Sequence, residues 1–435
     1  MGKKILIVGS GGREHAMAWK LSTSPHLDKL YIAPGNAGTS QLGENVPLNA
    51  LDITGLAAFA KSKHVDFTVV GPDDPLAAGI VDEFMARGLR IFGPTKAAAE
   101  IEWSKAYAKS LMHKHHIPTA SFFTTAHRDE AVNHARMYFG EASSALVVKA
   151  DGLALGKGVY ICQNYQEAEA AIDEIMIKKV HGLAGIKVVL EDFVAGNEVS
   201  LHAFCDGVSF SLFPTAQDHK SQLEGDKGPN TGGMGTIAPV PWFSGRKIAK
   251  QRIVSKILTA LKADGRPFTG CLYPGIKVEP DGGEAMVLEY NARFGDPETQ
   301  VYMRLLKTDL LEIIEACIDG KLDKIDVQWY QGFAACIVLA SEGYPGVYKK
   351  DRQITGIEAA EKLHDLKVFH AGTVYEDGKL RTSGGRVLGV TSWATTLKDA
   401  ISYAYEGIEK IHFKGKQFRK DIGKSSLLLG SHHAH

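Results

Sequence analysis

Short apolar runs alternate with amphipathic stretches along the first 95 residues. The apolar runs cover 4–8, 30–33, 67–70 and 90–92, and the amphipathic stretches between them cover 13–22, 54–63 and 76–87. Strand-like runs that alternate with helical patterns are typical of a parallel sheet with helices on both faces. The sequence therefore predicts a doubly wound α/β domain at the N-terminus, over residues 1–102.

From about residue 103 the order of the expected elements changes. A helical stretch is followed by expected strands at 145–150 and 158–162, a helix at 165–179, and strands at 186–192 and 197–205. Strands that follow one another without an intervening helix favour an α+β fold. We expect a second domain over residues 103–328.

A third pattern appears in the last quarter of the chain. An apolar strand is expected at 333–340, and Asp377-Gly378 between two alternating runs is a hairpin signal. A last helix at about 397–411 begins after Thr396 with an aspartate three residues on, which resembles a capping box. These elements predict a small α+β domain over 329–424.

The composition limits the classes of partner. The chain has 435 residues, enough for about three domains, and its 50 basic and 50 acidic residues leave no global field to attract nucleic acid or an anionic membrane. No apolar run approaches the roughly 18 residues of a membrane span, and the first one is too short for a signal peptide, so we expect a soluble protein. Residues 425–435 are expected to be a tail that is frayed over 430–435. The cysteines form no C-x-x-C pair, which favours core thiols and a reducing cytosol: Cys162, Cys205, Cys271, Cys317 and Cys336.

Residues 288–300, Leu-Glu-Tyr-Asn-Ala-Arg-Phe-Gly-Asp-Pro-Glu-Thr-Gln, gather polar groups where an apolar strand is expected to end. Glu289, Asn291 and Arg293 are two residues apart, so an extended chain would point all three to one face. A carboxylate and an amide carbonyl suit Mg²⁺, which takes oxygen ligands and shares its coordination sphere with phosphates. The segment therefore predicts Mg-nucleotide chemistry, and the alternative is a solvated surface turn.

A glycine-rich segment, Gly9-Ser-Gly-Gly-Arg-Glu-His15, follows the first expected strand and opens a helix. A helix N-terminus with free N–H groups, together with Arg13 and His15, predicts a pocket for a single phosphate. Glu14 stands where the dinucleotide fingerprint needs a third glycine, which argues against a nicotinamide cofactor. The alternative is a tight turn with purely structural glycines.

Three further loops carry candidate chemistry. Gly71-Pro-Asp-Asp-Pro-Leu would place Asp73 and Asp74 near the first loop, either to bind sugar hydroxyls or to cap a helix. The loop at 149–158 has a lysine near each end but not the P-loop spacing, so we expect a mobile lid over a polyphosphate. The loop at 228–235 is too glycine-rich to pack and predicts a flexible segment near a ligand.

Taken together, these segments resemble the glycinamide ribonucleotide synthetases, the phosphoribosylamine–glycine ligases of the ATP-grasp superfamily. The similarity extends from the 9–15 loop to Gly384-Gly-Arg-Val-Leu-Gly-Val-Thr, and Arg293-Phe-Gly-Asp-Pro-Glu-Thr-Gln is its most specific part. The resemblance implies an ATP-grasp fold whose two α+β lobes, at about 103–190 and 191–328, hold ATP and Mg²⁺ or Mn²⁺. It also implies a cytoplasmic, monomeric enzyme that uses glycine and 5-phosphoribosylamine as substrates.

The resemblance also implies roles for individual residues. ATP would be bound by Lys105, Lys149, Gly152, Gly156, Lys157, Gly158, Glu191, Phe193, Val194 and Glu198, and the metal by Glu289 and Asn291. The substrates would be bound by Gly9, Gly11, Gly12, Arg13, Glu14, His15, Gly71, Pro72, Asp73, Asn230, Thr231, Arg293 and Asp296. Catalysis would use Arg293, Lys149, Asp218 and Lys220. The family usually has glutamate where this chain has Asp73, which leaves the ribose contact open.

The implied reaction explains why cations and a metal are needed. Glycine would first be phosphorylated by ATP to glycyl phosphate, and lysines, Arg293 and Mg²⁺ would offset the charge on the transferring phosphoryl group. No side-chain nucleophile is required, so the cysteines and the histidines at 113, 115 and 116 are given no role. The alternatives are an ATP-grasp ligase or carboxylase that acts on another acid, a nicotinamide-dependent oxidoreductase, and a non-catalytic nucleotide-binding module.

Overall fold

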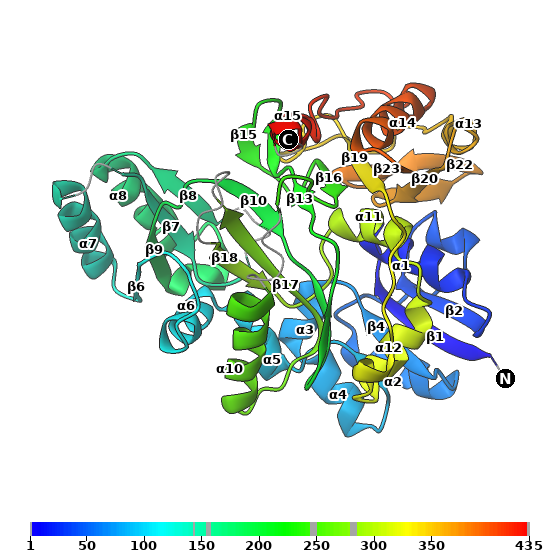
Figure 1. Cartoon of the computed structure of the whole chain (residues 1–435), viewed down its shortest axis with the longest axis horizontal. Coiled ribbons are helices and arrows are strands. Elements are labelled where there is room, and N and C mark those ends of the chain that lie inside the picture. Colours follow the sequence, from blue (N-terminus) through cyan, green and yellow to red (C-terminus); the bar gives the residue numbers. More distant parts are fainter. Residues whose placement is uncertain (1, 142–143, 154–157, 244–249, 279–284, 433–435) are drawn as a thin grey trace.

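Figure 1 shows the computed structural model, which describes residues 2–141, 144–153, 158–243, 250–278 and 285–432. The N-terminal part (blue) and the C-terminal part (orange to red) lie together at one end of the long axis (Figure 1). A lobe of the central part (teal) projects at the other end. The candidate site residues lie in the N-terminal and central parts, between Gly9 and Asp296.

The N-terminal part is a parallel sheet in the order β3-β2-β1-β4-β5, which confirms the predicted doubly wound domain. Its strands are β1 (Lys3–Gly9), β2 (Leu27–Pro34), β3 (Glu44–Asn45), β4 (Phe67–Val70) and β5 (Ile91–Phe92). Its helices are α1 (Gly12–Ser22), α2 (Ile53–Ser62), α3 (Asp73–Ala78), α4 (Ile80–Ala86) and α5 (Lys96–Trp103), with a short η1 (Thr39–Gln41). The helix expected at 76–87 is two helices, because Gly79 leaves the helical conformation with φ of 93°.

Alternate residues of β1 pack into two different cores, as the period of a strand requires. Ile5 and Ile7 lie in the core that contains α1 and α12 (Leu310–Ile318), whereas Leu6 and Val8 lie in the core that contains α2 and α4. Because α12 belongs to the central part, the two parts share a hydrophobic core. The loop that follows β1 is therefore held at a fixed place against the central part.

The central part contains two sheets. The first has the order β6-β9-β7-β8 and packs against α7 and α8; its elements are α6 (Lys105–Lys114), β6 (Phe122–Thr125), α7 (Arg128–Glu141), β7 (Leu146–Ala150), β8 (Val159–Cys162), α8 (Tyr165–Met176), η2 (Gly182–Ile186) and β9 (Val188–Asp192). In the second, β17 pairs with β10, β11 and β18, and β12 pairs with β11. These elements are β10 (Asn197–Ser200), β11 (Ala203–Asp206), β12 (Phe210–Leu212), η3 (Lys250–Ser255), α10 (Lys256–Ala263), β17 (Thr269–Val278), β18 (Met286–Asn291), α11 (Glu298–Leu305) and η4 (Leu322–Lys324).

The expected strand at 197–205 is two strands. Both β10 and β11 pair with β17, and the chain breaks between them at Leu201 and His202. Burial continues through this break, since Leu201 and His202 are both buried. A buried interruption of this kind has no signal in the apolar pattern.

The C-terminal part contributes to a sheet in the order β13-β16-β19-β23-β20. Its elements are β13 (Gln217–Asp218), β16 (Gly235–Ala238), β19 (Phe333–Ala340), α13 (Ile357–Glu361), β20 (Leu366–His370), β23 (Arg386–Ala394) and α14 (Leu397–Lys410). Two hairpins flank it, β14 (Ser221–Leu223) with β15 (Lys227–Asn230), and β21 (Thr373–Glu376) with β22 (Lys379–Thr382). β13 and β16 precede the other strands of this sheet by about a hundred residues in the chain. The backbone hydrogen bonds of the sheet therefore join the C-terminal part to the segment that carries Asp218.

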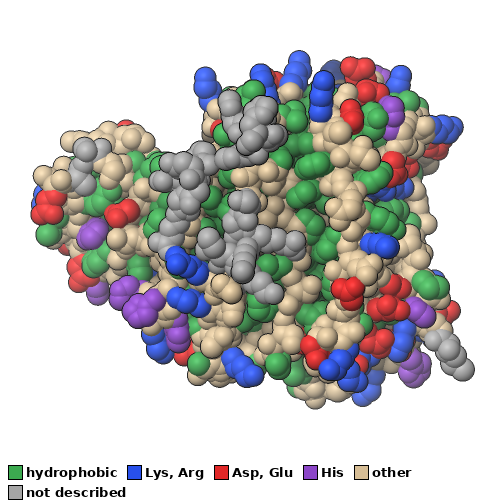
Figure 2. Space-filling model, in the orientation of Figure 1, with side chains coloured by type: hydrophobic (Ala, Val, Ile, Leu, Met, Phe, Trp, Pro, Cys, Tyr) green, Lys and Arg blue, Asp and Glu red, His purple; other side chains and the backbone are tan. Residues whose placement is uncertain are grey.

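Several local predictions are confirmed. Asp377 and Gly378 form the turn of the β21–β22 hairpin with positive φ angles of 50° and 71°, and Thr396 caps α14 by accepting from Asp399 N at 3.1 Å. All five cysteines are free and buried. No helix within the described ranges combines the length and apolar character that a membrane crossing needs. On the face drawn in Figure 2, acidic and basic side chains are interspersed.

Two predictions are wrong. The loop expected at 228–235 begins as strand β15, because the chain around it forms a hairpin with β14. The tail expected from 425, and expected to fray over 430–435, is helical as far as His432 in α15 (Lys424–His432), and Ser426 is buried. The hydroxyl of Ser426 donates to Gln217 Oε1 at 2.5 Å and accepts from Trp242 Nε1 at 2.9 Å. These long-range contacts order α15, and residues 433–435 lie outside the described ranges.

Candidate active site

The candidate metal ligands lie at the end of β18. Glu289 and Asn291 both pair with β17 and are two residues apart, so their side chains leave the same face of the sheet. The strand ends at Asn291, and Arg293 folds back so that its Nη2 donates to Asn291 Oδ1 at 3.1 Å. The third side chain thus joins the cluster through a turn and not, as expected, through an extended chain.

Glu289 is surrounded by positive charge. Burial raises the pKa of its carboxyl group, but Lys105, Lys149 and two further cations outweigh burial and hold the pKa below its usual value. The group is therefore an anion at neutral pH. An ionised carboxylate beside an amide oxygen fits Mg²⁺ or Mn²⁺, because both ions prefer oxygen ligands.

Two lysines share one buried glutamate on the lobe that faces this cluster. Lys149 Nζ contacts one carboxylate oxygen of Glu191, Lys109 Nζ contacts the other, and none of the three side chains is more than 7% exposed. The Lys109 Nζ also donates to Thr119 Oγ1 at 2.7 Å. Both oxygens of Glu191 are thus engaged by lysines, a role that the sequence did not predict.

Lys109 itself was missed by sequence reasoning. It follows Lys105 by four residues on α6, and this spacing on one helix face was the available signal. Both lysines line a narrow pocket between the lobes, whose wall consists of Ile101, Glu102, Lys105, Ala108, Lys109, Met112, Lys149, Leu288, Glu289 and Tyr290. The wall combines apolar side chains with three lysines and two glutamates.

Lys105 also contacts the predicted lid segment. Its Nζ donates to Gly152 O at 3.2 Å, and the Gly158 carbonyl accepts from Ala150 N at 2.9 Å where β7 and β8 pair. The two ends of the segment are therefore anchored to the first lobe. Gly156 and Lys157, and with them most of the predicted lid, lie outside the described residues.

Phe193 and Val194 directly follow β9, where the chain passes from the first lobe to the second. The Phe193 N–H donates to Ala145 O at 3.2 Å, and its side chain is 41% exposed. An exposed aromatic ring beside the lobe junction is accessible to a planar ligand.

Lys220 lies among carboxylates. Its Nζ is 3.0 Å from Asp218 Oδ2 and 3.5 Å from Glu198 Oε1. Burial lowers the pKa of Lys220, but the surrounding acidic groups outweigh burial and raise it, so the ammonium stays charged. Thr231 is buried and its Oγ1 donates to Lys220 O at 2.8 Å, whereas Asn230 is exposed at the end of β15.

A buried hydrogen-bond network behind Lys220 was also missed. Glu298 is 1% exposed, and its Oε1 accepts from Tyr273 OH at 2.6 Å and from Ser200 Oγ at 3.1 Å. The ring of His202 stacks on Tyr273 with centroids 4.0 Å apart, and burial lowers the pKa of His202 to about 3. These residues come from separate strands and a helix, so no sequence spacing connects them.

The loop after β1 is closed by Glu14. Its carboxylate accepts from Gly11 N and from Arg13 Nε, both at 2.6 Å. A Cβ atom at Gly9 would meet the Glu14 side chain at 2.6 Å and one at Gly71 would meet it at 1.9 Å, so the two predicted loops touch. Glu14 stands where the dinucleotide fingerprint has its third glycine. Its carboxylate fills the volume that a glycine would leave open.

His15 does not face the same way as Arg13. It is 4% exposed, its Nδ1 accepts from His370 N at 2.7 Å, and its ring lies edge-on to Phe369 at 5.6 Å. Burial lowers the pKa of His15 well below its usual value, so the ring is neutral. The residue joins α1 to β20, and the structure does not bring it into the loop pocket.

Asp296 lies against the first loop. Its Oδ1 accepts from Gln300 Nε2 at 2.8 Å, and its Oδ2 is 3.1 Å from Arg386 Nη2. A Cβ atom at Gly11 would lie 3.3 Å from Asp296 Oδ2, and one at Gly12 would lie 2.6 Å from Gln300 Nε2. The 9–15 loop and the segment after Arg293 therefore face each other without space for larger side chains.

Arg293 stands between the pocket that Lys105 and Glu289 line and the two loops at 9–15 and 71–73. Its Nη2 is 3.1 Å from Glu102 Oε1, and Glu102 Oε2 accepts from Ala292 N at 2.7 Å. Burial raises the pKa of Glu102 to about 7, although Arg293 acts in the opposite direction. Asp73, at the start of α3 after Pro72, adds its negative charge to the field at both groups. Glu102 was not predicted, and it fixes the turn that carries Arg293.

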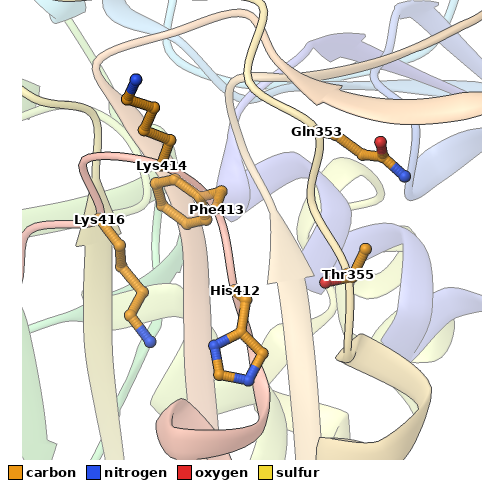
Figure 3. A pocket seen from close by; sticks show the side chains of 6 residues that line it. All are labelled: Gln353, Thr355, His412, Phe413, Lys414 and Lys416. Carbon is orange, nitrogen blue, oxygen red and sulfur yellow. The ribbon is translucent and has the colours of Figure 1, made fainter.

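A larger hollow of about 350 Å³ lies in the C-terminal part, lined by Gln353, Thr355, His412, Phe413, Lys414 and Lys416 (Figure 3). Lys414 and Lys416 point in different directions in this view. The Lys416 Nζ donates to Ile408 O at 2.9 Å and to Ile411 O at 2.6 Å, so it caps the end of α14. None of the predicted site residues lines this hollow.

Two α+β lobes around a charged pocket, with a carboxylate and an amide at the end of a strand, define the ATP-grasp class. The biotin carboxylase domain of Hydrogenobacter thermophilus 2-oxoglutarate carboxylase has the same fold with a TM-score of 0.73, at 14% identity and 99% coverage of both chains. Three domain models of the phosphoribosylglycinamide synthetase family match the chain: the N domain over 3–102, the ATP-grasp (A) domain over 103–299 and the C domain over 334–425.

Relatives that are named phosphoribosylamine–glycine ligase align with nearly the whole chain. The phosphoribosylamine–glycine ligase of Ralstonia nicotianae is 47% identical over 428 residues, 98% of this chain and 99% of that protein. The crystal structure of phosphoribosylamine–glycine ligase from Thermotoga maritima is 35% identical, with a TM-score of 0.83 and coverage of 96% and 99%. The chain belongs to the phosphoribosylglycinamide synthetase family, as the resemblance predicted.

Proposed function

We propose that the protein ligates glycine to 5-phosphoribosylamine with ATP, forming glycinamide ribonucleotide, ADP and phosphate through glycyl phosphate. This reaction is the second step of purine synthesis. The proposal is supported by relatives that are named for this ligase and that align with the chain over nearly their full length. The observation that carries the proposal is the position of Arg293. It joins a nucleotide pocket lined by Lys105 and Lys149 to the loops that carry Arg13 and Asp296.

ATP is assigned to the pocket between the lobes. Lys105 and Lys149 would bind its phosphates as point charges, with Lys157 added from the lid segment. The adenine and ribose are assigned to the lobe junction, at Phe193, Val194 and the nearby glutamates. A divalent metal, held by Glu289 and Asn291, would offset charge on the phosphates when bound.

Glycine is assigned to the region of Lys220 and Arg293. Lys220 pairs with Asp218, and Lys220 and Arg293 both lie in the field of Glu298, so cations and carboxylates are available for the two charged ends of a free amino acid. When the glycine carboxylate accepts the phosphoryl group, the same cations would stabilise the added negative charge. Thr231 would support this position through its hydrogen bond to the Lys220 carbonyl.

Phosphoribosylamine is assigned to the loops at 9–15 and 71–73. The N-terminus of α1 offers backbone donors to a phosphate, and Asp73 lies where it would accept hydrogen bonds from ribose hydroxyls. Its amine would attack the acyl carbon and release phosphate. We further propose that the protein is a monomer of the cytosol, consistent with its five free thiols.

Product analysis tests the proposal. The protein is incubated with ATP, Mg²⁺, glycine and freshly made phosphoribosylamine, and we expect glycinamide ribonucleotide and ADP in equal amounts. Alanine and serine in place of glycine are the controls for a ligase that acts on another acid. If a folded protein forms no glycinamide ribonucleotide, or forms the product of another acid at the same rate, the assignment is wrong.

A further inference from the structure

Arg386, the first residue of β23, brings the C-terminal part into the active site. Its Nη1 donates to Asp296 O at 2.7 Å and to Gly232 O, and its Nη2 is 3.1 Å from Asp296 Oδ2. One guanidinium therefore joins two segments that are more than sixty residues apart in the chain. Both segments carry residues assigned above to the substrates.

We propose that Arg386 is a positioning residue for the ligation, and this inference rests on the proposed function. It acts through two contacts. It holds the turn at Gly232 on the glycine side of the site, and it holds Asp296 on the phosphoribosylamine side. Arg386 is placed so that the acyl group and the amine meet in one geometry. Nucleotide binding does not depend on it, because its contacts lie outside the pocket between the lobes.

The turn at Gly232 lies against the glycine side. A Cβ atom at Gly233 would meet Asp218 Oδ1 at 2.6 Å and the Pro297 ring at 2.5 Å, so the turn is in contact with both. Gly233 has φ of +108°, a conformation that favours glycine. If the Gly232 carbonyl lost its donor, the turn beside Asp218 would lose one of the contacts that hold it in place.

A second residue of the C-terminal part supports the same turn. The Gly232 N–H donates to Tyr344 OH at 3.0 Å, while the Gly232 carbonyl is held by Arg386. Both backbone groups of this glycine are thus bound by side chains from beyond residue 340. The C-terminal part therefore helps to hold this turn in place through two side chains.

Asp296 lies against the phosphoribosylamine side, beside Gly11 at the start of α1. Burial raises the pKa of Asp296, but Arg386, Arg13 and the hydrogen bond from Gln300 outweigh burial and lower it. Without Arg386 a buried carboxylate would lose its principal counter-ion next to a site that must accept a phosphate. Such a carboxylate would be repelled from that phosphate.

The geometry requires arginine. Three acceptors lie around the guanidinium, and a planar fork satisfies them at the same time, whereas a lysine ammonium on a flexible stem is a point charge. Replacement by lysine therefore keeps the charge and loses the bridge. This difference separates a positioning role from a purely electrostatic one.

Arg381 provides a matched control. It also lies in the C-terminal part, its Nη1 is 2.8 Å from Asp351 Oδ1, and its side chain is 23% exposed, compared with 21% for Arg386. The two arginines differ in their partners, because Asp351 is 70% exposed, whereas Asp296 is 15% exposed and lies against the first loop. Arg381→Met should therefore reproduce any general effect of losing an ion pair in this part of the chain.

The experiment compares Arg386→Lys, Arg386→Met and Arg381→Met with the wild type. For both Arg386 variants we expect kcat/KM for glycine and phosphoribosylamine to fall by roughly 10- to 100-fold, with the smaller loss for lysine. The Kd for MgADP, measured by calorimetry, should stay within about twofold, and Arg381→Met should match the wild type. If Arg386→Met does not fold, Arg386→Lys carries the test.

A double-mutant cycle with Asp296→Asn tests whether Arg386 acts through this carboxylate. The combined loss in kcat/KM should be smaller than the product of the two single losses, because both remove the same bridge. Independent losses or an equal loss of MgADP affinity would overturn the inference. If the wild type forms no product, the proposed function fails; if it does and the Arg386 variants match it, only this inference fails.

Discussion

The two sides of the candidate site handle charge in different ways. On the side proposed for the nucleotide, Lys109 and Lys149 share one carboxylate, Glu191. On the loop side arginines pair with carboxylates one to one, Arg13 with Glu14 and Arg386 with Asp296. Two lysines on one carboxylate leave positive charge for a polyanionic ligand, whereas one-to-one ion pairs keep the other side in a fixed shape before any ligand arrives.

The two sides also differ in where their residues come from. The nucleotide side is built from α5, α6, β7, β9 and β18, within about 200 consecutive residues. The loop side joins the first loop, the segment after Arg293 and the start of β23, which come from all three parts of the chain. Substitutions on the two sides should therefore have separable consequences.

The largest effect is expected for Lys109→Met on the nucleotide side. Removing one partner of a buried ion pair leaves Glu191 incompletely compensated, so the free energy of unfolding should fall by about 3–5 kcal/mol, as measured by urea denaturation. Lys114→Met, at the exposed end of the same helix, is the control. The added substitution Glu191→Gln should recover part of the loss, and additive losses would contradict the shared-glutamate arrangement.

Glu289→Gln should come next. It removes the anionic member of the proposed metal pair, and kcat should fall by roughly 100-fold or more, with partial recovery in excess Mg²⁺. Glu174→Gln, which changes an exposed carboxylate of the first lobe, is the control. Wild-type turnover with unchanged metal dependence would place the metal elsewhere.

Arg13→Ala tests the loop side. We expect the KM for phosphoribosylamine to rise about tenfold, because the variant loses a charged group that holds Glu14 and Phe294 O. The Kd for ADP in titration calorimetry should not change. Arg87→Ala, on the surface of the same N-terminal part, is the control. Equal weakening of ADP binding would show that the two sides are not separable.

The smallest effect concerns pH and the contact between α1 and β20. Burial lowers the pKa of His370 to about 4, below the value of about 6.5 expected in the unfolded chain. The unfolded state therefore binds more protons below pH 6.5, and stability present above that pH is lost as the pH falls toward 4. Between pH 7 and pH 5.5 this residue should lower the free energy of unfolding by about 1 kcal/mol.

The measurement is urea denaturation at both pH values for His370→Gln and for the wild type. The variant should lose that part of the pH dependence, whereas His113→Gln, at an exposed helix end, should keep it. An unchanged pH dependence in His370→Gln would show that the contact does not titrate in this range.

The sequence predicted local features well. Apolar alternation predicted the parallel sheet, a turn dipeptide predicted the β21–β22 hairpin, and a capping threonine predicted the start of α14. Each of these signals acts over a few neighbouring residues, where backbone preference and side-chain period dominate. The prediction failed at α15, whose order depends on contacts of Ser426 with Gln217 and Trp242.

What the sequence determined by itself is the set of chemical groups and their local spacing: Glu289, Asn291 and Arg293 at the end of a strand, and glycines after β1. The tertiary structure alone decided which groups are neutralised. Lys109 acquires its role from Glu191, more than eighty residues away, and Arg386 from Asp296. The physical reason is that burial makes an unpaired charge costly, so folding selects partners across the chain that no local pattern records.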